Sequence, residues 1–306
     1  MKKISIFIFL VVLVLGLAGL WFYQNAKPVA TTLNFKNFLI VRGTSAGQIG
    51  TNLQKEGLIK SAVAFKLYVR LTGLSQKILA GEYVLSSNLS LFRITDQLLQ
   101  GPKEIWVTIP EGLRREEIAR KFAASLNKDE TFIQDFLTVS KDKEGFLFPE
   151  TYLFPKEATA QKIVEKMLAT FDTKAGLALT KENIILASLV ERETKTAEER
   201  LIVAGILQNR IKIGMALQVD ATIQFIKGNW QPIALDDRKI KSPYNTYLNR
   251  GLPPGPICNP GLSSLKAALD PSETEYLYYL HDSDGVIHYA KTLEEHNRNI
   301  NKYIGT

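Results

Sequence analysis

The segment Lys181–Glu193, with the sequence KENIILASLVERE, follows Thr180 and precedes Thr194. Threonine is a common helix N-cap, and at about 100° per residue the apolar side chains of the segment fall on one face. That face consists of Ile185, Leu186, Leu189 and Val190. The pattern predicts an amphipathic helix that packs on a core.

Two glutamates near the end of this helix are expected to differ in environment. On the helical wheel Glu193 falls in the middle of the apolar face, whereas Glu191 falls on the opposite side. Loss of solvent raises a carboxyl pKa, so Glu193 is the candidate general acid near neutral pH. The alternative is that the helix frays before Glu193 and both carboxylates are solvated. A perturbed carboxylate can also be purely structural.

A second helix is predicted after a tight break that would hold Glu193 in place. Thr196 and Glu199 form a capping-box pattern, and Gly214 ends the helix. Its apolar face consists of Ile202, Val203, Ile206, Leu207 and Ile211. Arg210 lies near that face, where it either binds an anionic substrate group or, as we favour, pairs with a helix acid.

Loops rich in hydroxyls, amides and aromatic rings follow this helix. They span residues 217–222, 242–247 and 249–256. Aromatic faces together with a few fixed polar partners are typical of a ligand site, and this composition suits a glycan cleft. The alternative is an ordinary surface loop stiffened by prolines. Further on, residues 276–280 and 286–289 flank Asp284-Gly285 and predict a β-hairpin.

Several classes of site are excluded or disfavoured. The single cysteine, Cys258, excludes an intramolecular disulfide framework, a zinc ribbon and an iron–sulfur cluster. No G-x-S-x-G motif and no glycine-rich phosphate loop occurs in the chain. The three histidines are spaced too irregularly for a metal site: His281, His288 and His296.

The composition is that of a globular protein with a modest positive charge. The 306 residues are 45% hydrophobic and 23% charged. At about 150 residues per domain, the length indicates about two domains plus an appendage. The net charge of +7 suits anionic lipid or an anionic polymer. No Lys/Arg-dense stripe with interleaved aromatics occurs, so nucleic acid is not an expected partner.

The N-terminus predicts a membrane anchor over residues 1–23. The uncharged run Ile4–Tyr23 follows two lysines, and as a helix it is about 30 Å long, the thickness of the hydrocarbon core. Trp21 and Tyr23 close the run, as interfacial aromatics do. The alternative, a cleaved signal peptide, has a shorter apolar region and a small-residue cleavage site. Because the lysines precede the run, we expect the N-terminus to be cytoplasmic.

The sequence pattern divides the rest of the chain into four parts. They are a tether at 24–36, a small α/β module at 37–104, a connecting segment at 105–156 with a loop from 141, and a domain at 157–306. The expected elements of the module are a strand at 38–41, helices behind Ser45 and Ser61, and a third helix ended by Gly101. The strand–glycine–helix pattern around Gly43 recurs weakly around Gly112. It is either a LysM-like glycan-binding pattern or, as the short match favours, a generic strand–turn–helix.

Three segments with distinctive sequences occur in order along the chain. They are 144–152 (EGFLFPETY), 187–194 (ASLVERET, followed by Glu199-Arg200 and Asn209-Arg210) and 244–255 (YNTYLNRGLPPG). Together they resemble the YceG-like (MltG) family of membrane-anchored endolytic murein transglycosylases, over nearly the whole chain. Arg192 stands where this family usually has lysine, and Cys258 where a small residue without a thiol is usual.

The resemblance implies lytic, non-hydrolytic cleavage of peptidoglycan glycan strands without a metal or cofactor. The family's catalytic glutamate matches Glu193. It would protonate the oxygen of the β-1,4 bond between N-acetylmuramic acid and N-acetylglucosamine. It would then act as base on the muramyl C6 hydroxyl, which leaves a 1,6-anhydro end. The candidate glycan contacts are Gln218, Asp220, Asn245 and Tyr247.

The implied fold class is α+β, with a transmembrane helix, a LysM-like module and a mixed α+β catalytic domain. The implied location is the bacterial cytoplasmic membrane with the catalytic domain on the outer side. There the protein would terminate nascent strands, in association with peptidoglycan synthases of the elongation or division machinery. Two alternatives stay open: a peptidoglycan-binding scaffold in which Glu193 is structural, and a hydrolase that uses Glu193 with Asp220 and water.

Overall fold

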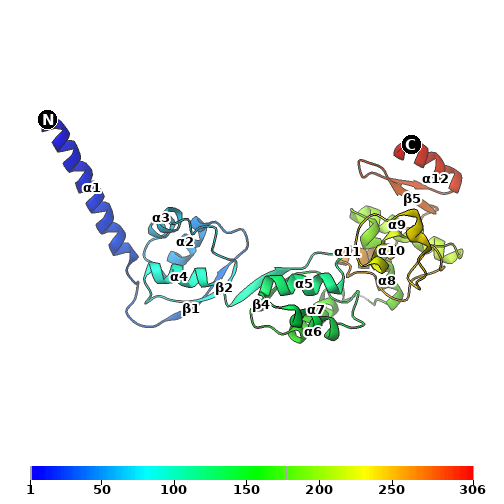
Figure 1. The fold of residues 1–306 in the computed structure, drawn as a ribbon, viewed down its shortest axis with the longest axis horizontal. Helices are drawn as coiled ribbons and strands as arrows, with labels where there is room; N and C mark the ends of the chain where they lie inside the picture. The colour runs from blue at the N-terminus through cyan, green and yellow to red at the C-terminus, as the bar shows by residue number, and fades with distance from the viewer. Residues whose placement is uncertain (1, 177, 306) are drawn as a thin grey trace. The chain divides into compact units, whose positions relative to one another are not determined.

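The computed structural model describes residues 2–176 and 178–305, with side chains from Phe7 onward. Met1, part of the predicted anchor at 1–23, lies outside the described residues. The chain forms two compact units (Figure 1). Unit 1 consists of the residues through Val107 together with 152–157. Unit 2 consists of 108–151 and the residues from Ala158 onward.

The N-terminal apolar run forms one long helix in unit 1, α1 (Lys2–Ala26). Its segment Phe7–Ala26 has a mean hydropathy of 2.2 and is long and apolar enough to cross a membrane. The tether between anchor and module is shorter than the predicted 24–36, because α1 continues to Ala26 and the first strand begins at Phe35. Ala26 is only 2% exposed and packs in the core of unit 1, so the end of α1 is part of that unit.

The rest of unit 1 is a sheet with helices packed on one face. The strands are ordered β1-β2-β3-β4, with β1 antiparallel to β2 and β2 antiparallel to β3. The strands are β1 (Phe35–Ile40), β2 (Gly81–Ser86), β3 (Glu104–Thr108) and β4 (Thr151–Pro155), and the helices are α2 (Ala46–Lys55), α3 (Ala62–Leu71) and α4 (Leu91–Gln100). The predicted caps Ser45 and Ser61 are confirmed, since each side chain accepts a bond from the backbone N–H three residues on.

Alternation along β1 places Phe38 and Ile40 in the core with the helices, whereas Leu39 is 46% exposed on the other face. The predicted loop at 141–156 is wrong over its last residues, which form strand β4 beside β3. Its sequence, TYLFP, alternates exposed and covered residues.

Unit 2 is mostly helical, with a β-hairpin near its end that is followed by a short helix. Its elements are α5 (Arg115–Leu126), α6 (Glu130–Val139), α7 (Ala160–Ala175), α8 (Lys181–Glu193), α9 (Ala197–Lys212), α10 (Asp220–Lys227), the 3-10 helix η1 (Leu235–Lys239), α11 (Leu262–Leu269), β5 (Tyr278–His281), β6 (Ile287–Ala290), α12 (Leu293–Asn299) and the π-helical turn η2 (Ile300–Ile304). The predicted connecting segment 105–156 therefore contains two helices, and its residues 108–151 group with this unit.

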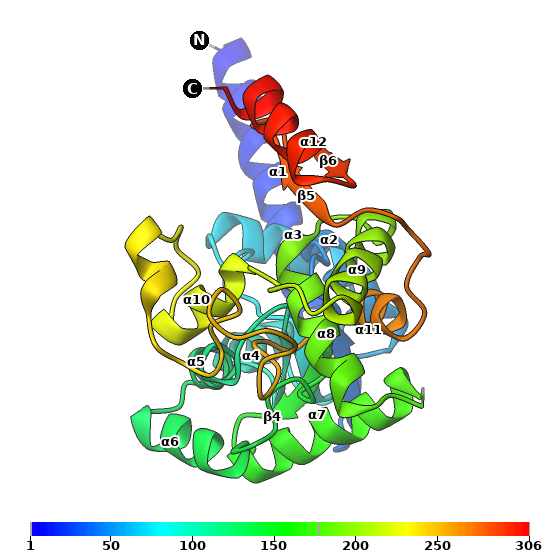
Figure 2. The same ribbon diagram turned by 90° about the vertical axis from the view of Figure 1, so that its right-hand side faces the viewer.

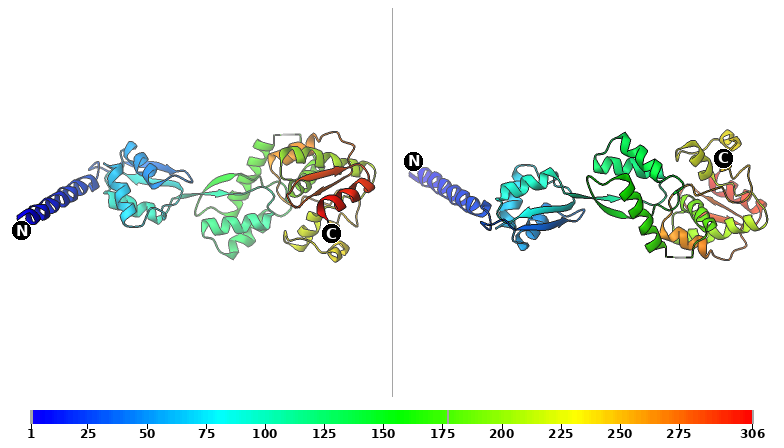
Figure 3. Two further views of the ribbon diagram at one scale, coloured as in Figure 1. Left: turned by 90° about the horizontal axis from the view of Figure 1, so that it is seen from above. Right: turned by 90° about the horizontal axis from the view of Figure 1, so that it is seen from below.

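Helix α8 is the centre of unit 2. It has the predicted bounds, with Thr180 as its N-cap, and every residue of 184–190 is buried. Helices α9 and α11 pack on α8 and on each other (Figure 2). The hairpin β5–β6 is confirmed, and α12 packs on both of its strands (Figure 3). Together these elements place the end of α8 close to β5.

Candidate active site

Glu193 is the last residue of α8, and its carboxyl group faces a pocket rather than bulk solvent. Burial raises its pKa above the usual range, and the nearby charge of Asp220 raises it further. The hydroxyl of Tyr279 and the backbone amide of Ala221 lower it in part. The next residue, Thr194, ends the helix and donates its hydroxyl to Val190 O at 2.7 Å, so the chain on both sides of Glu193 is fixed.

Tyr279, on strand β5, is the hydrogen-bond partner of this carboxyl group. Its phenol oxygen donates to Glu193 Oε2 at 2.9 Å. Burial and the charge of Glu193 raise the pKa of Tyr279 well above its usual value, so the phenol keeps its proton. The sequence analysis did not select this residue. The only available signal was the predicted hairpin, which places Tyr279 on a strand without indicating what it faces.

Two adjoining depressions meet at Glu193, which lines both together with His281. The first, of about 580 Å³, is lined by aromatic, charged, polar and apolar side chains that include Arg210, Gln218, Asp220, Arg238, Tyr247 and Tyr278. The second, of about 420 Å³, is lined by Arg192, Thr194, Lys195, Asp282, Ser283, Asp284 and Gly285. A polymer that occupies both depressions would place an internal bond over the carboxyl group of Glu193.

Three of the four predicted glycan contacts lie in the larger depression. The Tyr247 hydroxyl donates to Asp220 Oδ1, and the Arg238 guanidinium stands 4.0 Å from the same oxygen and 4.9 Å from the centre of the Tyr247 ring. Gln218 is exposed at the rim, with a backbone φ of 51° that is uncommon for residues other than glycine. Such a conformation is often kept for function.

The fourth, Asn245, is fully buried and does not line either depression. Its amide nitrogen donates to Arg238 O at 2.9 Å and to Ile240 O at 2.7 Å, and its amide oxygen accepts from Tyr247 N at 2.9 Å. The side chain therefore joins the segment that carries Arg238 to the segment that carries Tyr247.

Arg210 does not pair with a helix acid, so the interpretation we favoured from the sequence is wrong. Its Nε donates to Leu277 O at 2.6 Å and one terminal nitrogen to Leu217 O at 2.6 Å. Because these acceptors are backbone carbonyls, the amino-acid sequence gives no signal from which the two hydrogen bonds could be predicted. Arg210 as a whole is 6% exposed, and it lines the larger depression. Burial lowers its pKa, and the charge of Glu193 opposes that shift.

Glu191 is also buried, so the expectation that only Glu193 would lose solvent is wrong. The Glu191 side chain is 6% exposed and accepts hydrogen bonds from Ser264 Oγ at 2.7 Å, from Gly261 N at 2.9 Å and from Arg200 at 3.3 Å. The two carboxyl groups differ instead in the charges and hydrogen-bond donors that offset their loss of solvent. Glu191 has a cation and two neutral donors, whereas Glu193 has two neutral donors, the phenol of Tyr279 and the backbone amide of Ala221.

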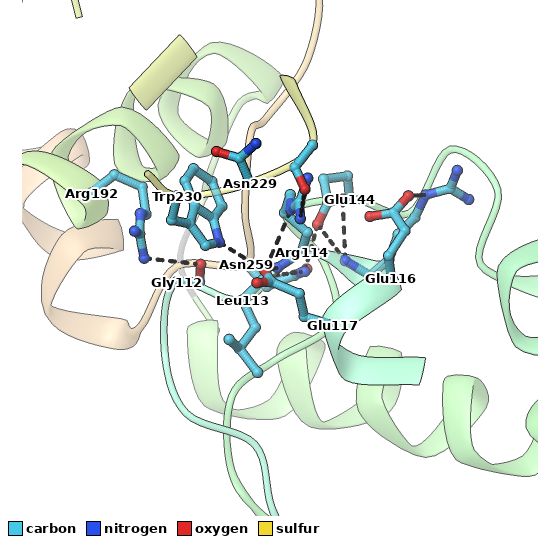
Figure 4. Close-up of polar contacts among 12 residues, drawn as sticks. Gly112, Leu113, Arg114, Glu116, Glu117, Glu144, Arg192, Asn229, Trp230 and Asn259 are labelled. Atoms are coloured by element: carbon cyan, nitrogen blue, oxygen red, sulfur yellow. Dashed lines mark hydrogen bonds and ion pairs between the residues drawn. The ribbon is translucent and has the colours of Figure 1, made fainter. Parts of the chain in front are cut away.

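Arg192, between the two glutamates, is held by Trp230 (Figure 4). Its guanidinium carbon is 3.9 Å from the centre of the indole ring, and one nitrogen donates to Gly112 O at 3.5 Å. The indole N–H donates to Glu117 Oε2 at 2.9 Å. The charge of Arg192 lowers the pKa of Glu193, by less than the hydrogen bond from Tyr279 does.

A buried carboxyl group, Glu144, joins the neighbouring loops (Figure 4). It accepts from Asn259 Nδ2 at 2.6 Å and from Arg115 N at 3.2 Å. Burial raises its pKa to about 8. The Asn259 side-chain oxygen in turn accepts from Gly145 N and Leu147 N, so residues 144–147 are tied to the loop that precedes α11.

The sequence profile of the YceG-like family matches residues 38–302. The chain belongs to the YceG-like family. An endolytic murein transglycosylase of Bacillus subtilis is 35% identical over 96% of this chain and 92% of that protein. One of Streptococcus pneumoniae R6 is 30% identical over 99% of this chain and 66% of that protein. A crystal structure of a putative YceG-like protein of Listeria monocytogenes covers 86% of this chain and 98% of that one, with a TM-score of 0.59 and 29% identity.

The segments that indicated the YceG-like family fall around one site. Residues 187–194 carry Glu193, 244–255 carry Tyr247, and 144–152 contribute Glu144 to the network of loops beside α8. Cys258 is fully buried, with its sulfur 3.3 Å from Ser188 O, and therefore packs against α8 away from the depressions.

Proposed function

We propose that this YceG-like protein is an endolytic murein transglycosylase in which Glu193 is the single catalytic acid and base. The observation that carries the assignment is the position of Glu193: it is the fixed end of a buried helix, with a raised pKa, where two depressions meet. The names of the relatives in Bacillus and Streptococcus support the reaction class and the peptidoglycan substrate.

In the first step the protonated Glu193 gives its proton to the oxygen that joins muramyl C1 to the next N-acetylglucosamine. The C1–O bond breaks with its electron pair on the departing sugar, and positive charge develops at C1. Burial raises the pKa of Glu193 and so favours its protonated form, which a general acid requires.

In the second step the C6 hydroxyl of the same muramyl residue attacks C1, and the Glu193 carboxylate takes the hydroxyl proton. The 1,6-anhydro bond forms, Glu193 is again protonated, and no water is consumed. One carboxyl group suffices because the nucleophile belongs to the substrate, in contrast to the usual pair of carboxylates in glycosidases. Tyr279 stabilises the transient carboxylate by its hydrogen bond.

The larger depression holds the glycan in this proposal. Tyr247 and Tyr278 contribute aromatic side chains to its lining, and Gln218 and Asp220 offer polar partners. Asn245 acts as a positioning residue, since its amide group is used within the loop that carries Tyr247.

Product analysis tests the reaction against its alternatives. Purified glycan strands are incubated with the parent protein, with Glu193→Gln and with Glu191→Gln, and the new chain ends are identified by mass spectrometry. Anhydromuramyl ends from the parent and none from Glu193→Gln support the proposal. Reducing ends would indicate a hydrolase that uses Glu193 with Asp220, and binding without cleavage would indicate a scaffold.

We further propose that α1 is retained as a single-pass anchor, with the N-terminus inside and unit 2 on the outer side of the cytoplasmic membrane. The length and hydropathy of α1 and the exposed rings of Trp21 and Tyr23 near its end support this assignment. An intact N-terminus in protein purified from membranes is expected by mass spectrometry. A mature N-terminus near residue 25 would contradict it. In this position the enzyme would terminate nascent strands beside peptidoglycan synthases.

For unit 1 we propose a LysM-like role in positioning glycan. The order β1-α2-α3-β2 and a pocket of about 330 Å³ lined by Asn37, Leu39, Asn52 and Lys55 support it. In a Glu193→Gln background, which prevents cleavage, Asn52→Ala is expected to weaken binding of the full chain to insoluble peptidoglycan. Unchanged binding would argue for a purely structural module.

A further inference from the structure

Helix α3 carries an apolar stripe that the fold leaves uncovered. Val63, Leu67 and Leu71 follow one another at intervals of four residues and are 65%, 42% and 78% exposed. The opposite face of the same helix packs Phe65 and Val69 in the core of unit 1. We propose that this stripe docks on the surface of the membrane that α1 crosses, with the side chains inserted at the boundary of headgroups and acyl chains.

The place of α3 beside the end of α1 supports this orientation. The ring of Phe22 lies 6.1 Å from that of Phe92 on α4, and Phe92 lies 5.0 Å from Tyr68 on α3. Phe22 is four residues from the end of the spanning segment, or about 6 Å along the helix axis. These aromatic contacts therefore lie at the depth where a spanning helix leaves the hydrocarbon. Figure 1 shows α3 and α4 next to that end of α1.

The charges around the stripe suit an anionic lipid surface. Between Gly57 and Gly81 the chain has four basic residues and no acidic one: Lys60, Lys66, Arg70 and Lys77. Lys66 and Arg70 are exposed on α3 itself, beside the stripe. Apolar side chains flanked by exposed Lys and Arg are the pattern of helices that lie in a membrane interface.

Lipid is the occupant favoured over a second protein because the stripe continues an apolar surface that already enters the membrane. From Leu71 it runs through Tyr68 and Phe92 to Phe22 of α1. The inference rests on α1 as a membrane helix. It does not depend on Glu193 or on the proposed reaction, so failure of either leaves the other intact.

The test uses the full chain and two single substitutions on opposite sides of unit 1. Leu71→Cys lies on the stripe, and Leu39→Cys lies on strand β1, on the side opposite the core residues Phe38 and Ile40. The only native cysteine, Cys258, is fully buried, and burial raises its pKa well above the usual value, so a thiol-reactive fluorophore labels the introduced site. Both proteins are reconstituted in vesicles of phosphatidylglycerol and phosphatidylcholine that contain nitroxide-labelled lipid.

We expect the label at Leu71→Cys to emit at shorter wavelength and to be quenched by headgroup and shallow acyl nitroxides at least about twofold more than the label at Leu39→Cys. Lys66→Gln combined with Arg70→Gln should reduce this difference, most clearly at low salt. Equal, weak quenching at both sites would overturn the proposal. Shielding without lipid quenching, or shielding that grows with the ratio of protein to lipid, would indicate a protein partner or a second copy and would overturn it as well.

Discussion

The phenol of Tyr279 donates a hydrogen bond of 2.9 Å to Oε2 of Glu193, across 86 residues of sequence. Burial raises the pKa of both groups, so the phenol remains a donor while the carboxyl group changes between its two forms. A hydrogen bond of this kind favours the carboxylate. It therefore opposes the effect of burial, and in the proposed reaction it would help Glu193 to serve in turn as acid and base.

Tyr279→Phe is expected to impair the base step and shift the pH profile. Without the donor, the pKa of Glu193 rises further, so the loss of activity at alkaline pH moves to higher pH. The turnover number should fall roughly 10-fold or more, since a hydrogen bond to a charged group contributes about 1.5–3 kcal/mol. The rate of anhydromuramyl formation measured across pH checks both effects. Tyr276→Phe, which does not line the depressions, is the matched control.

Glu193→Gln should abolish most turnover without loss of stability. Glutamine keeps the size but cannot transfer a proton, so the rate should fall by about 10² or more. Glu191→Gln should instead retain most activity and melt at lower temperature. It breaks the ion pair with Arg200, and disruption of a buried hydrogen-bonded group costs about 1–3 kcal/mol. The reverse result, an inactive Glu191→Gln with an active Glu193→Gln, would show that the acid is misassigned.

Asp220→Asn separates lytic from hydrolytic cleavage. If Asp220 binds glycan and does not activate water, the variant should show a higher KM while every product end stays anhydromuramyl. The asparagine can still accept the hydrogen bond from Tyr247. A parent protein that yields reducing ends, lost in Asp220→Asn, would support the hydrolase instead.

Gly145→Ala should destabilise the protein much more than Gly43→Ala. Both glycines have a positive φ, 88° and 86°, where an alanine costs about 1–2 kcal/mol. At Gly145 the new Cβ would also lie 2.6 Å from Pro256 Cγ and 2.9 Å from Ile184 Cγ2, whereas at Gly43 it meets nothing within 4 Å. Thermal denaturation of the two variants isolates the cost of that close packing. Similar melting temperatures would contradict the contact.

Glu144 should make stability depend on pH. Its pKa rises from 4.5 to about 8 on folding, so its contribution is complete below the unfolded value and is lost as pH rises through the folded value. From about pH 5 to about pH 9 the parent should therefore lose more stability than Glu144→Gln, by about 1.4 kcal/mol for each unit of pKa shift. If the stability of the two proteins changed with pH in the same way, the pKa of Glu144 would not be raised by folding.

The sequence predicted elements well where a local signal exists. Helix α8 has the predicted bounds because Thr180 caps it and its apolar residues recur with helical spacing. The wheel failed for Glu191 because it assumes one covered face, whereas residues 184–190 of α8 are all buried and the helix packs on α9, α10 and α11. An amphipathic pattern gives the direction of the main core but not the contacts on the other side.

The candidate site was predictable for Glu193 and less so for its partners. Tyr279 and Arg238 reach the depression through long-range packing, and no spacing between them and Glu193 encodes the contact. Asn245 was selected for its polar side chain, yet its amide is fully used by backbone groups of its own loop. Composition indicates that a loop is polar, but only the fold shows which polar groups are already satisfied.

The order of strands has a consequence for synthesis on the ribosome. Strand β4, which lies beside β3 in the sheet, comes after α5 and α6 in the chain. The ribosome must therefore synthesise two helices of unit 2 before the sheet of unit 1 has its last strand. Until then β3 presents an open edge, ready to pair with any extended chain nearby. A cut between residues 104 and 105 would leave an open sheet edge in both fragments. Neither fragment would then be a complete folding unit.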